Sequence, residues 1–398
     1  MTSALQTRET LRLCTAGSVD DGKSTFVGRL LHDTKSVLAD QLSAVERTSK
    51  EKGLDQLDLS LLVDGLRAER EQGITIDVAY RYFSTPKRTF ILADTPGHVQ
   101  YTRNTVTGVS TSQVVVLLVD ARNGIVEQTL RHLRAAELLG VRTVVLAVNK
   151  IDLVDFRADT FRKIEQEFVE VAEAFDEVYV IPISALLGDN VVEPSAHMPW
   201  YDGPTVLEVL ENISVTSGRA QELDFRFPIQ YVIRDHATDY RGYAGRVTAG
   251  KIRVGDTVSL GGGRASVVSG IDTSDGPVEL AQAGDSVVLL LADDIDLSRG
   301  DLIAGEARPA SVRSFSATVV GLADKEVRAG QQVRVRYGTS LVRARIAEGS
   351  WGLNDVADVR IELASELPVE PYAARGAVGA VLIIDQATGD TLGAGLVT

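Results

Sequence analysis

Apolar and polar residues follow two different patterns along the 398-residue chain. Over residues 11–212, short β-branched runs are separated by longer amphipathic stretches, which is typical of a mostly parallel sheet flanked by helices. After about residue 218, short alternating strands follow one another with glycine turns between them. This second pattern predicts β-barrels. The fold class that we expect is therefore α/β, followed by two all-β barrel domains.

The boundaries come from the same change of pattern and from a break at residues 307–309. We expect an α/β domain over residues 1–218, a first barrel over 219–309 and a second barrel over 310–398. Strands are predicted at 11–15, 78–83, 89–93, 114–119, 143–148 and 178–183, and amphipathic helices at 127–139 and 160–175.

Composition and charge argue against some classes of function. The chain has 41 basic and 55 acidic residues and a net charge of −14, which argues against a general nucleic-acid binder. The single cysteine, Cys14, lies in the apolar first strand, where it fits a core position and a reducing compartment. The first residues lack an apolar segment behind a basic start, and no run of about 18 apolar residues occurs. We expect a cytoplasmic protein with no membrane contact.

A complete GxxxxGK[ST] motif follows the first predicted strand and precedes a helix-like stretch. A glycine-rich turn is the plainer interpretation, but this context favours a phosphate-binding loop whose backbone amides surround anionic oxygens. Lys23 would meet the β and γ phosphates, and the Ser24 hydroxyl would bind the bridging Mg²⁺. The loop and the residue after it are Gly17, Ser18, Val19, Asp20, Asp21, Gly22, Lys23, Ser24 and Thr25.

Further nucleotide motifs stand at the ends of later predicted strands. The DTPGH sequence Asp94, Thr95, Pro96, Gly97 and His98 could be a turn, but beside a phosphate loop it indicates a triphosphate sensor, with Asp94 holding Mg²⁺ through a water. The NKID sequence is Asn149, Lys150, Ile151 and Asp152, and the SAL sequence is Ser184, Ala185 and Leu186.

The NKID and SAL sequences favour guanine over adenine. The Asp152 carboxylate accepts from guanine N1–H and its 2-amino group, which adenine does not offer together. Lys150 can lay its stem on the base, Asn149 can join its own loop to the phosphate loop, and a backbone amide of the SAL segment can meet guanine O6. The expected ligands are GTP and GDP, with Mg²⁺ as cofactor.

Two residues are candidates for hydrolysis of the triphosphate. Thr75, within residues 69–77, could bind Mg²⁺ through its hydroxyl in a segment that orders with triphosphate, although a polar helix cap is the plainer interpretation. His98 is the candidate for orienting the attacking water, because histidine titrates near neutrality and hydrogen bonds through either nitrogen. The other four histidines, His32, His132, His197 and His236, fit helix faces or loops.

The order GSVDDGKS, GITID, DTPGH, NKID and SAL, followed by two all-β units, resembles the elongation factor Tu superfamily of translational-type GTPases. Within it, the chain is similar to the GTPase subunits of bacterial sulfate adenylyltransferase, or ATP sulfurylase. The matching segments begin at Gly17, Leu61, Asp94, Asn149, Met198 and Asp224, and a closing segment covers residues 384–397, so the resemblance spans nearly the whole chain. Departures are Val99, where a glutamate is usual, and a shortened third domain between residues 344 and 375.

The resemblance implies a heteromeric enzyme. A smaller catalytic subunit would join ATP and sulfate into adenosine 5′-phosphosulfate, and this chain would supply the GTP cycle. No nucleic-acid partner is expected. Two alternatives remain at this point: an elongation-factor-like carrier of aminoacyl-tRNA and a stand-alone regulatory GTPase.

Overall fold

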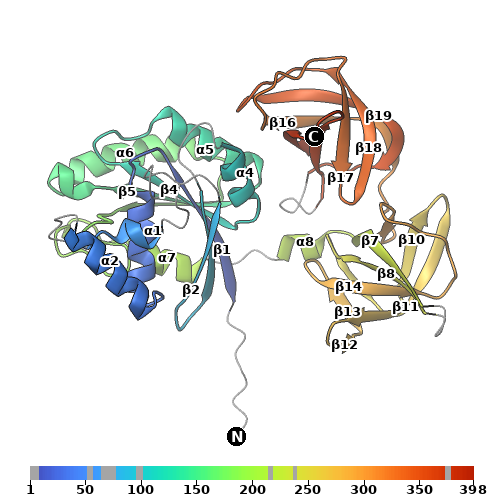
Figure 1. Ribbon diagram of the computed structural model, residues 1–398, viewed down its shortest axis with the longest axis horizontal. Coiled ribbons are helices and arrows are strands. Elements are labelled where there is room, and N and C mark those ends of the chain that lie inside the picture. Colours follow the sequence, from blue (N-terminus) through green and yellow to red (C-terminus); the bar gives the residue numbers. More distant parts are fainter. Residues whose placement is uncertain are drawn as a thin grey trace, which may run out of the picture. The chain divides into compact units, whose positions relative to one another are not determined.

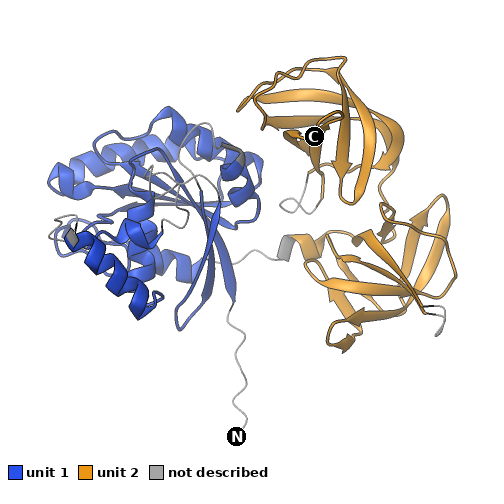
Figure 2. Ribbon diagram, viewed as in Figure 1, with its two compact units in different colours: residues 1–215 blue, residues 216–398 orange. Residues whose placement is uncertain are grey.

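The computed structural model describes residues 9–51, 57–63, 78–95, 102–213, 218–235, 240–372 and 378–398. The chain divides into two compact units, residues 1–215 and 216–398 (Figure 2). The first unit holds an α/β domain, and the second holds two β-barrels (Figure 1). No helix among the described residues is long and apolar enough to span a membrane.

The first unit is built on a six-stranded sheet with the order β2-β3-β1-β4-β5-β6. β2 runs antiparallel to β3, and the other neighbouring strands are parallel. Every residue of β4 and β5 is buried, as expected for central strands covered on both faces. The strands are β1 (Thr10–Gly17), β2 (Ala79–Ser84), β3 (Thr89–Asp94), β4 (Val114–Asp120), β5 (Thr143–Asn149) and β6 (Glu177–Pro182).

Helices cover both faces of this sheet (Figure 1). Apolar residues of α1 and α7, among them Phe26 and Val209, pack in one hydrophobic core, and residues of α5 and α6, among them Leu133 and Phe168, pack in the other. The helices are α1 (Lys23–Asp33), α2 (Ala39–Glu51), α4 (Thr102–Ser110), α5 (Glu127–Leu138), α6 (Ala158–Val171) and α7 (Val206–Asn212), with 3-10 turns η1 (Leu59–Leu62) and η3 (Ile151–Val154).

Helix α6 ends earlier than its apolar spacing predicts. The expected helix runs to residue 175, but α6 ends at Val171, and the Ala172 amide donates to the Val169 carbonyl as a cap. Phe175 is nevertheless buried, in the turn that follows. The apolar pattern therefore continues past the helix because the turn also packs on the core.

The first barrel is a ring of six strands. Its order is β10-β15-β7-β8-β14-β11, and pairing of β10 with β11 closes the ring, while β12 adds to β11 at the edge. The elements are α8 (Gly218–Glu222), β7 (Arg226–Asp235), β8 (Tyr240–Arg246), β9 (Lys251–Arg253), β10 (Thr257–Gly261), β11 (Arg264–Thr273), β12 (Gly276–Pro277), β13 (Leu280–Gln282), β14 (Ser286–Leu291) and β15 (Leu302–Ala304). A separate two-stranded sheet joins β9 and β13.

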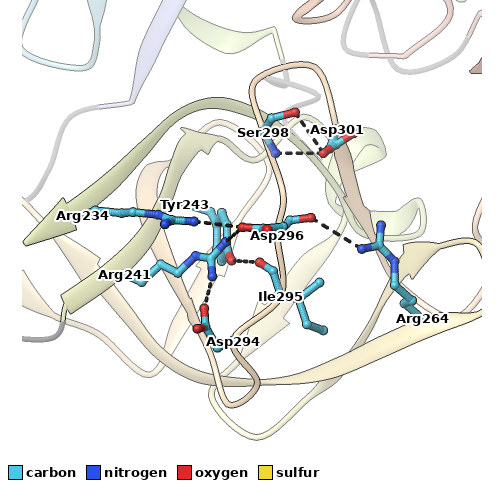
Figure 3. Close-up of polar contacts among 9 residues, drawn as sticks. All are labelled: Arg234, Arg241, Tyr243, Arg264, Asp294, Ile295, Asp296, Ser298 and Asp301. Atoms are coloured by element: carbon cyan, nitrogen blue, oxygen red, sulfur yellow. Dashed lines mark hydrogen bonds and ion pairs between the residues drawn. The ribbon is translucent and has the colours of Figure 1, made fainter. Parts of the chain in front are cut away.

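Arginines fasten the loop between β14 and β15 to this barrel (Figure 3). Arg234 and Arg241 donate to the Asp296 carboxylate over 2.9 and 2.8 Å, and Arg241 also pairs with Asp294. The Tyr243 hydroxyl donates to the Ile295 carbonyl over 2.5 Å. Hydrogen bonds from Arg241 and Arg234 lower the pKa of Asp296. The loop is thus held by strands that are distant from it in sequence.

The second barrel is closed, with the order β16-β19-β18-β17-β20-β21. Its core includes the fully buried Trp351. Gly321 is needed at the end of β16, because an added Cβ would lie 1.8 Å from the Gly352 carbonyl oxygen. The strands are β16 (Ser311–Gly321), β17 (Gln332–Tyr337), β18 (Ser340–Glu348), β19 (Val356–Pro368), β20 (Ala380–Asp385) and β21 (Thr391–Val397).

A buried ion pair joins the two barrels. Arg226 of β7 donates to both carboxylate oxygens of Glu370, which follows β19, over 2.8 and 2.7 Å. The same guanidinium donates to the Ala307 carbonyl over 2.7 Å, and the Arg226 side chain is 7% exposed. A second contact runs from the Ser340 hydroxyl to the Gly300 carbonyl over 2.7 Å. A planar guanidinium suits this bidentate arrangement better than an ammonium group would.

Two buried side chains of the α/β domain have strongly shifted pKa values. Burial raises the pKa of the Cys14 thiol to about 12, so this core residue stays protonated. Burial and the positive charges of Lys23 and Arg131 lower the pKa of His132, on α5, to about 3. His132 is 2% exposed and lies 3.0 Å from Gln128 Nε2, so the predicted helix-face histidine belongs to the buried face.

Loss of the ion pair between the barrels should destabilise the second unit. Arg226→Met would leave Glu370 charged and largely buried, and we expect the free energy of unfolding to fall by about 3 kcal/mol. Arg345→Met is the control, because Arg345 and Glu362 form an exposed pair whose loss costs less than about 1 kcal/mol. Urea unfolding followed by circular dichroism measures both, and equal losses would contradict the prediction.

His132 should make the α/β domain sensitive to acid. The folded state keeps His132 neutral down to about pH 3, whereas in the unfolded chain it takes up a proton below about pH 6.5. The contribution of His132 to the free energy of unfolding is therefore constant above about pH 6.5 and is lost as the pH falls towards 3. This loss is about 2 kcal/mol between pH 7 and pH 5. Urea unfolding of His132→Gln should show a correspondingly smaller loss over that interval. The same pH dependence in both proteins would show that His132 is not responsible.

Candidate functional site

The predicted nucleotide motifs meet at one edge of the six-stranded sheet. Strands β1, β3 and β5 end at Gly17, Asp94 and Asn149, and the SAL segment begins two residues after β6. These strands are parallel, so their carboxyl ends share an edge, where open α/β sheets bind ligands. Register pairs Thr15 with Asp94, which places the triphosphate-sensor sequence beside the phosphate loop.

The phosphate loop needs its glycines for close contact. An added Cβ on Gly17 would lie 2.6 Å from the Leu118 carbonyl oxygen, and one on Gly22 would lie 2.4 Å from Asn149 Nδ2. Gly22 also has a φ of 89° where helix α1 begins. The loop therefore presents backbone rather than side chains, as an anion cradle at a helix N-terminus requires.

Lys23 lies folded against this loop. Its ammonium group donates to the carbonyls of Gly17 and Ser18, each over 3.0 Å, and the residue is 8% exposed. Burial lowers the pKa of Lys23, and the charges of Asp94, Asp21 and Asp20 oppose that shift. An ammonium group has three donors, so one remains for a phosphate oxygen.

Asp21 closes the phosphate loop. Its Oδ2 accepts from the Ser18 amide over 2.6 Å, and the residue is 5% exposed. Burial raises the pKa of this carboxyl, although the Ser18 amide and the charge of Lys23 oppose the shift. The carboxylate thus fixes the shape of the loop.

The oxygen atoms available here fit a magnesium ion. The Thr15 hydroxyl donates to Asp94 Oδ1 over 2.9 Å, and the Thr95 hydroxyl donates to the Thr15 carbonyl over 2.7 Å, so the buried Asp94 is held in place. Ser24 lies in the first turn of α1. Hydroxyl and carboxylate oxygens are the ligands that Mg²⁺ prefers beside phosphates.

Asn149 contacts the phosphate loop, as its motif predicts, and also the loop that follows β6, residues 184–188, which we call the base loop. Its Nδ2 donates to the Asp21 carbonyl over 2.8 Å, and its Oδ1 accepts from the Ala185 amide over 2.9 Å. The Ala185 amide is thus used inside the protein. In the SAL segment, the Leu186 amide donates to no acceptor among the described residues and is left for a ligand.

Lys150 sits in a charge network that the motif alone does not reveal. Its ammonium group lies 3.0 Å from Asp120 Oδ2 and donates to the Asp20 carbonyl of the phosphate loop. Arg122 donates to both Asp120 carboxylate oxygens over 2.9 and 2.6 Å. Burial raises the pKa of Asp120, but hydrogen bonds from Arg122 and Lys150 outweigh it and lower the pKa overall. The only sequence signal for Asp120 is an acidic residue that ends a fully apolar strand.

Asp152 offers an unused acceptor. It lies in the 3-10 turn η3, and its Oδ1 is buried without a hydrogen-bond partner among the described residues. A buried carboxylate oxygen without a partner is costly unless a ligand binds it. The Asp152 carboxylate is the group that the sequence assigns to guanine.

Some predicted site residues cannot be placed. Thr75 and the end of the DTPGH sequence, Pro96, Gly97 and His98, lie outside the described residues, as do Val99 and His236. The phosphate-loop and base-loop residues are described, and the contacts of Asn149 and Lys150 bring these loops together.

Comparisons with known proteins agree with this arrangement. Residues 8–216 match the family model described as the elongation factor Tu GTP binding domain. The GTPase-like domain of Saccharomyces cerevisiae Ski7, solved with GDP and inorganic phosphate, is similar in fold, with a TM-score of 0.55 over 98% of this chain and 97% of that chain at 18% identity. The fold and the site therefore define a GTP-binding protein of the elongation factor Tu class.

Three similar proteins identify a family within this class. Sulfate adenylyltransferase subunit 1 of Cronobacter sakazakii is 46% identical over 99% of this chain and 87% of its own length, and that of Laribacter hongkongensis is 44% identical over 98% and 86%. The bifunctional enzyme CysN/CysC of Mycobacterium tuberculosis is 49% identical over 97% of this chain and 67% of its own length. The chain belongs to the sulfate adenylyltransferase subunit 1 family. The predicted fold class and family are confirmed, and the carrier alternative is not favoured.

Asp152→Asn should change the base preference. An asparagine amide donates where guanine also donates, so GDP affinity should fall at least about 100-fold, while xanthosine diphosphate, with a carbonyl at C2, should bind more tightly than it does to the unchanged protein. Asp155→Asn, an exposed neighbour in the same turn, is the control and should keep GDP affinity. Calorimetric titration measures both. Unchanged GDP binding by Asp152→Asn would remove Asp152 from the base site.

Proposed function

We propose that this chain is the GTP-hydrolysing subunit of a sulfate adenylyltransferase and works in a heteromer with a smaller catalytic subunit. That subunit would join ATP and sulfate into adenosine 5′-phosphosulfate and pyrophosphate. The observation that carries the proposal is Asn149, which connects the phosphate loop to a base loop suited to guanine, in a chain of the subunit 1 family. The sites for ATP and sulfate are then expected on the partner, and a cytoplasmic location stays a prediction.

The chemistry explains why a GTPase would serve this reaction. The phosphoric–sulfuric anhydride is a high-energy bond, so adenylation of sulfate is uphill, and a coupled GTP hydrolysis can drive it. Coupling requires that the partner respond differently to the GTP and GDP states, because a ligand shifts an equilibrium only by its differential affinity.

Different residues of this chain would bind the phosphates, hold Mg²⁺ and orient the attacking water during GTP hydrolysis. Lys23 would hold the β and γ phosphates, and Ser24, Thr75 and Asp94 would hold Mg²⁺, with Asp94 acting through a water. The bound ion would neutralise phosphate charge. His98 would orient the attacking water, and the amides of the phosphate loop would stabilise the transferred group.

A division into three domains fits this cycle. We retain the boundaries 1–218, 219–309 and 310–398, which the first strands of the two barrels, β7 at Arg226 and β16 at Ser311, support. The ion pair between Arg226 and Glu370 favours movement of the two barrels as one body. Hydrolysis would then change how this body meets the catalytic subunit.

The first test is adenylylsulfate formation from ATP and sulfate by this chain with its small subunit, with and without GTP. GTP should raise product accumulation, and Lys23→Ala should abolish that effect by losing triphosphate binding. Lys163→Ala, an exposed lysine of α6, is the control and should behave as the unchanged protein. His98→Ala should bind GTP but hydrolyse it slowly. GTP hydrolysis with no effect on adenylylsulfate would refute the coupling and favour a regulatory GTPase.

A further inference from the structure

Arg29 of helix α1 holds the loop that follows β6. Its Nε donates to the Ala185 carbonyl over 3.1 Å, and an Nη donates to the Leu186 carbonyl. Its other Nη lies 3.6 Å from the Asp33 carboxylate on the same helix, and the Arg29 side chain is 18% exposed. The guanidinium also lies beside Gly188, where an added Cβ would be 3.6 Å from Nη1.

These contacts fix the orientation of two peptide groups. In a planar trans peptide the carbonyl and the following N–H point in opposite directions. The Ala185 carbonyl points to Arg29, so the Leu186 N–H points away from it. The Leu186 carbonyl also points to Arg29, and the Leu187 N–H beyond it donates to the Ser184 hydroxyl over 3.2 Å.

The neighbouring amides of this turn are already used. Ala185 N–H donates to Asn149 Oδ1 over 2.9 Å, and Gly188 N–H donates to the Ser184 carbonyl over 2.7 Å. The Leu186 N–H donates to no acceptor among the described residues. One donor of the turn is therefore left for a ligand, and its direction is set by what the preceding carbonyl binds.

We infer that Arg29 is a positioning residue for recognition of the base. It orients the peptide between Ala185 and Leu186 so that the Leu186 N–H is presented to the O6 carbonyl oxygen of guanine. This inference rests on the proposed binding of GTP and GDP. Arginine suits the role because its planar fork spans two carbonyls at once, whereas lysine offers a single ammonium group.

The position of Arg29 in the chain gives the contact a second consequence. Helix α1 begins at Lys23 in the phosphate loop, and Arg29 lies further along the same helix. The base loop is thus tied to the phosphate-binding helix through Arg29 and to the phosphate loop through Asn149. Loss of Arg29 leaves the Asn149 tie, so the variant should still fold and bind phosphates.

The test compares nucleotides that differ at O6. Arg29→Ala and the unchanged protein are titrated with GDP and with 2-aminopurine riboside diphosphate, which keeps the N2 amino group but lacks O6 and, with it, the N1–H that Asp152 accepts. The loss at N1 weakens this nucleotide equally in both proteins, so only the comparison between the proteins reports on O6. We expect Arg29→Ala to bind GDP about tenfold more weakly, since an oriented hydrogen bond to the base is lost. Its affinity for the 2-aminopurine nucleotide should equal that of the unchanged protein. The GDP affinity of Arg29→Lys should lie between that of Arg29→Ala and that of the unchanged protein. Arg131→Ala, which replaces an exposed arginine of α5, is the control.

The outcomes separate this inference from the proposed function. Equal weakening of both nucleotides by Arg29→Ala would mean that Arg29 supports the helix or the phosphate loop, and would overturn the inference. Unchanged GDP affinity would overturn it as well. If the unchanged protein bound neither nucleotide, or bound both equally, the proposed guanine site itself would fail. Circular dichroism of each variant confirms that it is folded.

Discussion

The side-chain amide of Asn149 is the interaction on which the nucleotide site depends. It donates to the phosphate loop at Asp21 and accepts from the base loop at Ala185, while its own strand is fully buried. Hydrophobic burial fixes the strands, but the loops at their ends have little apolar surface with which to fix one another. The Asn149 amide joins the two loops directly, because it can donate to one and accept from the other, and the contacts of Lys150 and Arg29 add to this order.

Much of the fold could be predicted because its signals are local. Strands β1 to β6 follow short apolar runs, and the motifs stand at strand ends, so a parallel sheet brings them to one edge without further information. The contact between Asn149 and the phosphate loop was also predictable from its motif. The order of strands in the barrels was not, since antiparallel pairing joins segments such as β17 and β20 that have no common sequence signal.

Other parts of the site depend on tertiary contacts. Arg29 and Arg122 look like ordinary surface arginines, and only the fold brings them to a carbonyl pair and to Asp120. His132 fits an exposed helix position as well as a buried one, and packing of α5 decides between them. The end of α6 was misplaced because periodicity reports burial, and a turn can bury an apolar residue as a helix does. Thr75 and His98 stay predictions.

The ion pair between Arg226 and Glu370 has a mechanical consequence. Closed barrels have no free sheet edges and deform little, and here two of them are fastened by a guanidinium with only 7% of its side chain exposed. The pair therefore favours rotation of the two barrels together. A protein bound to either barrel would then follow that rotation, which gives a partner two alternative surfaces through which to respond.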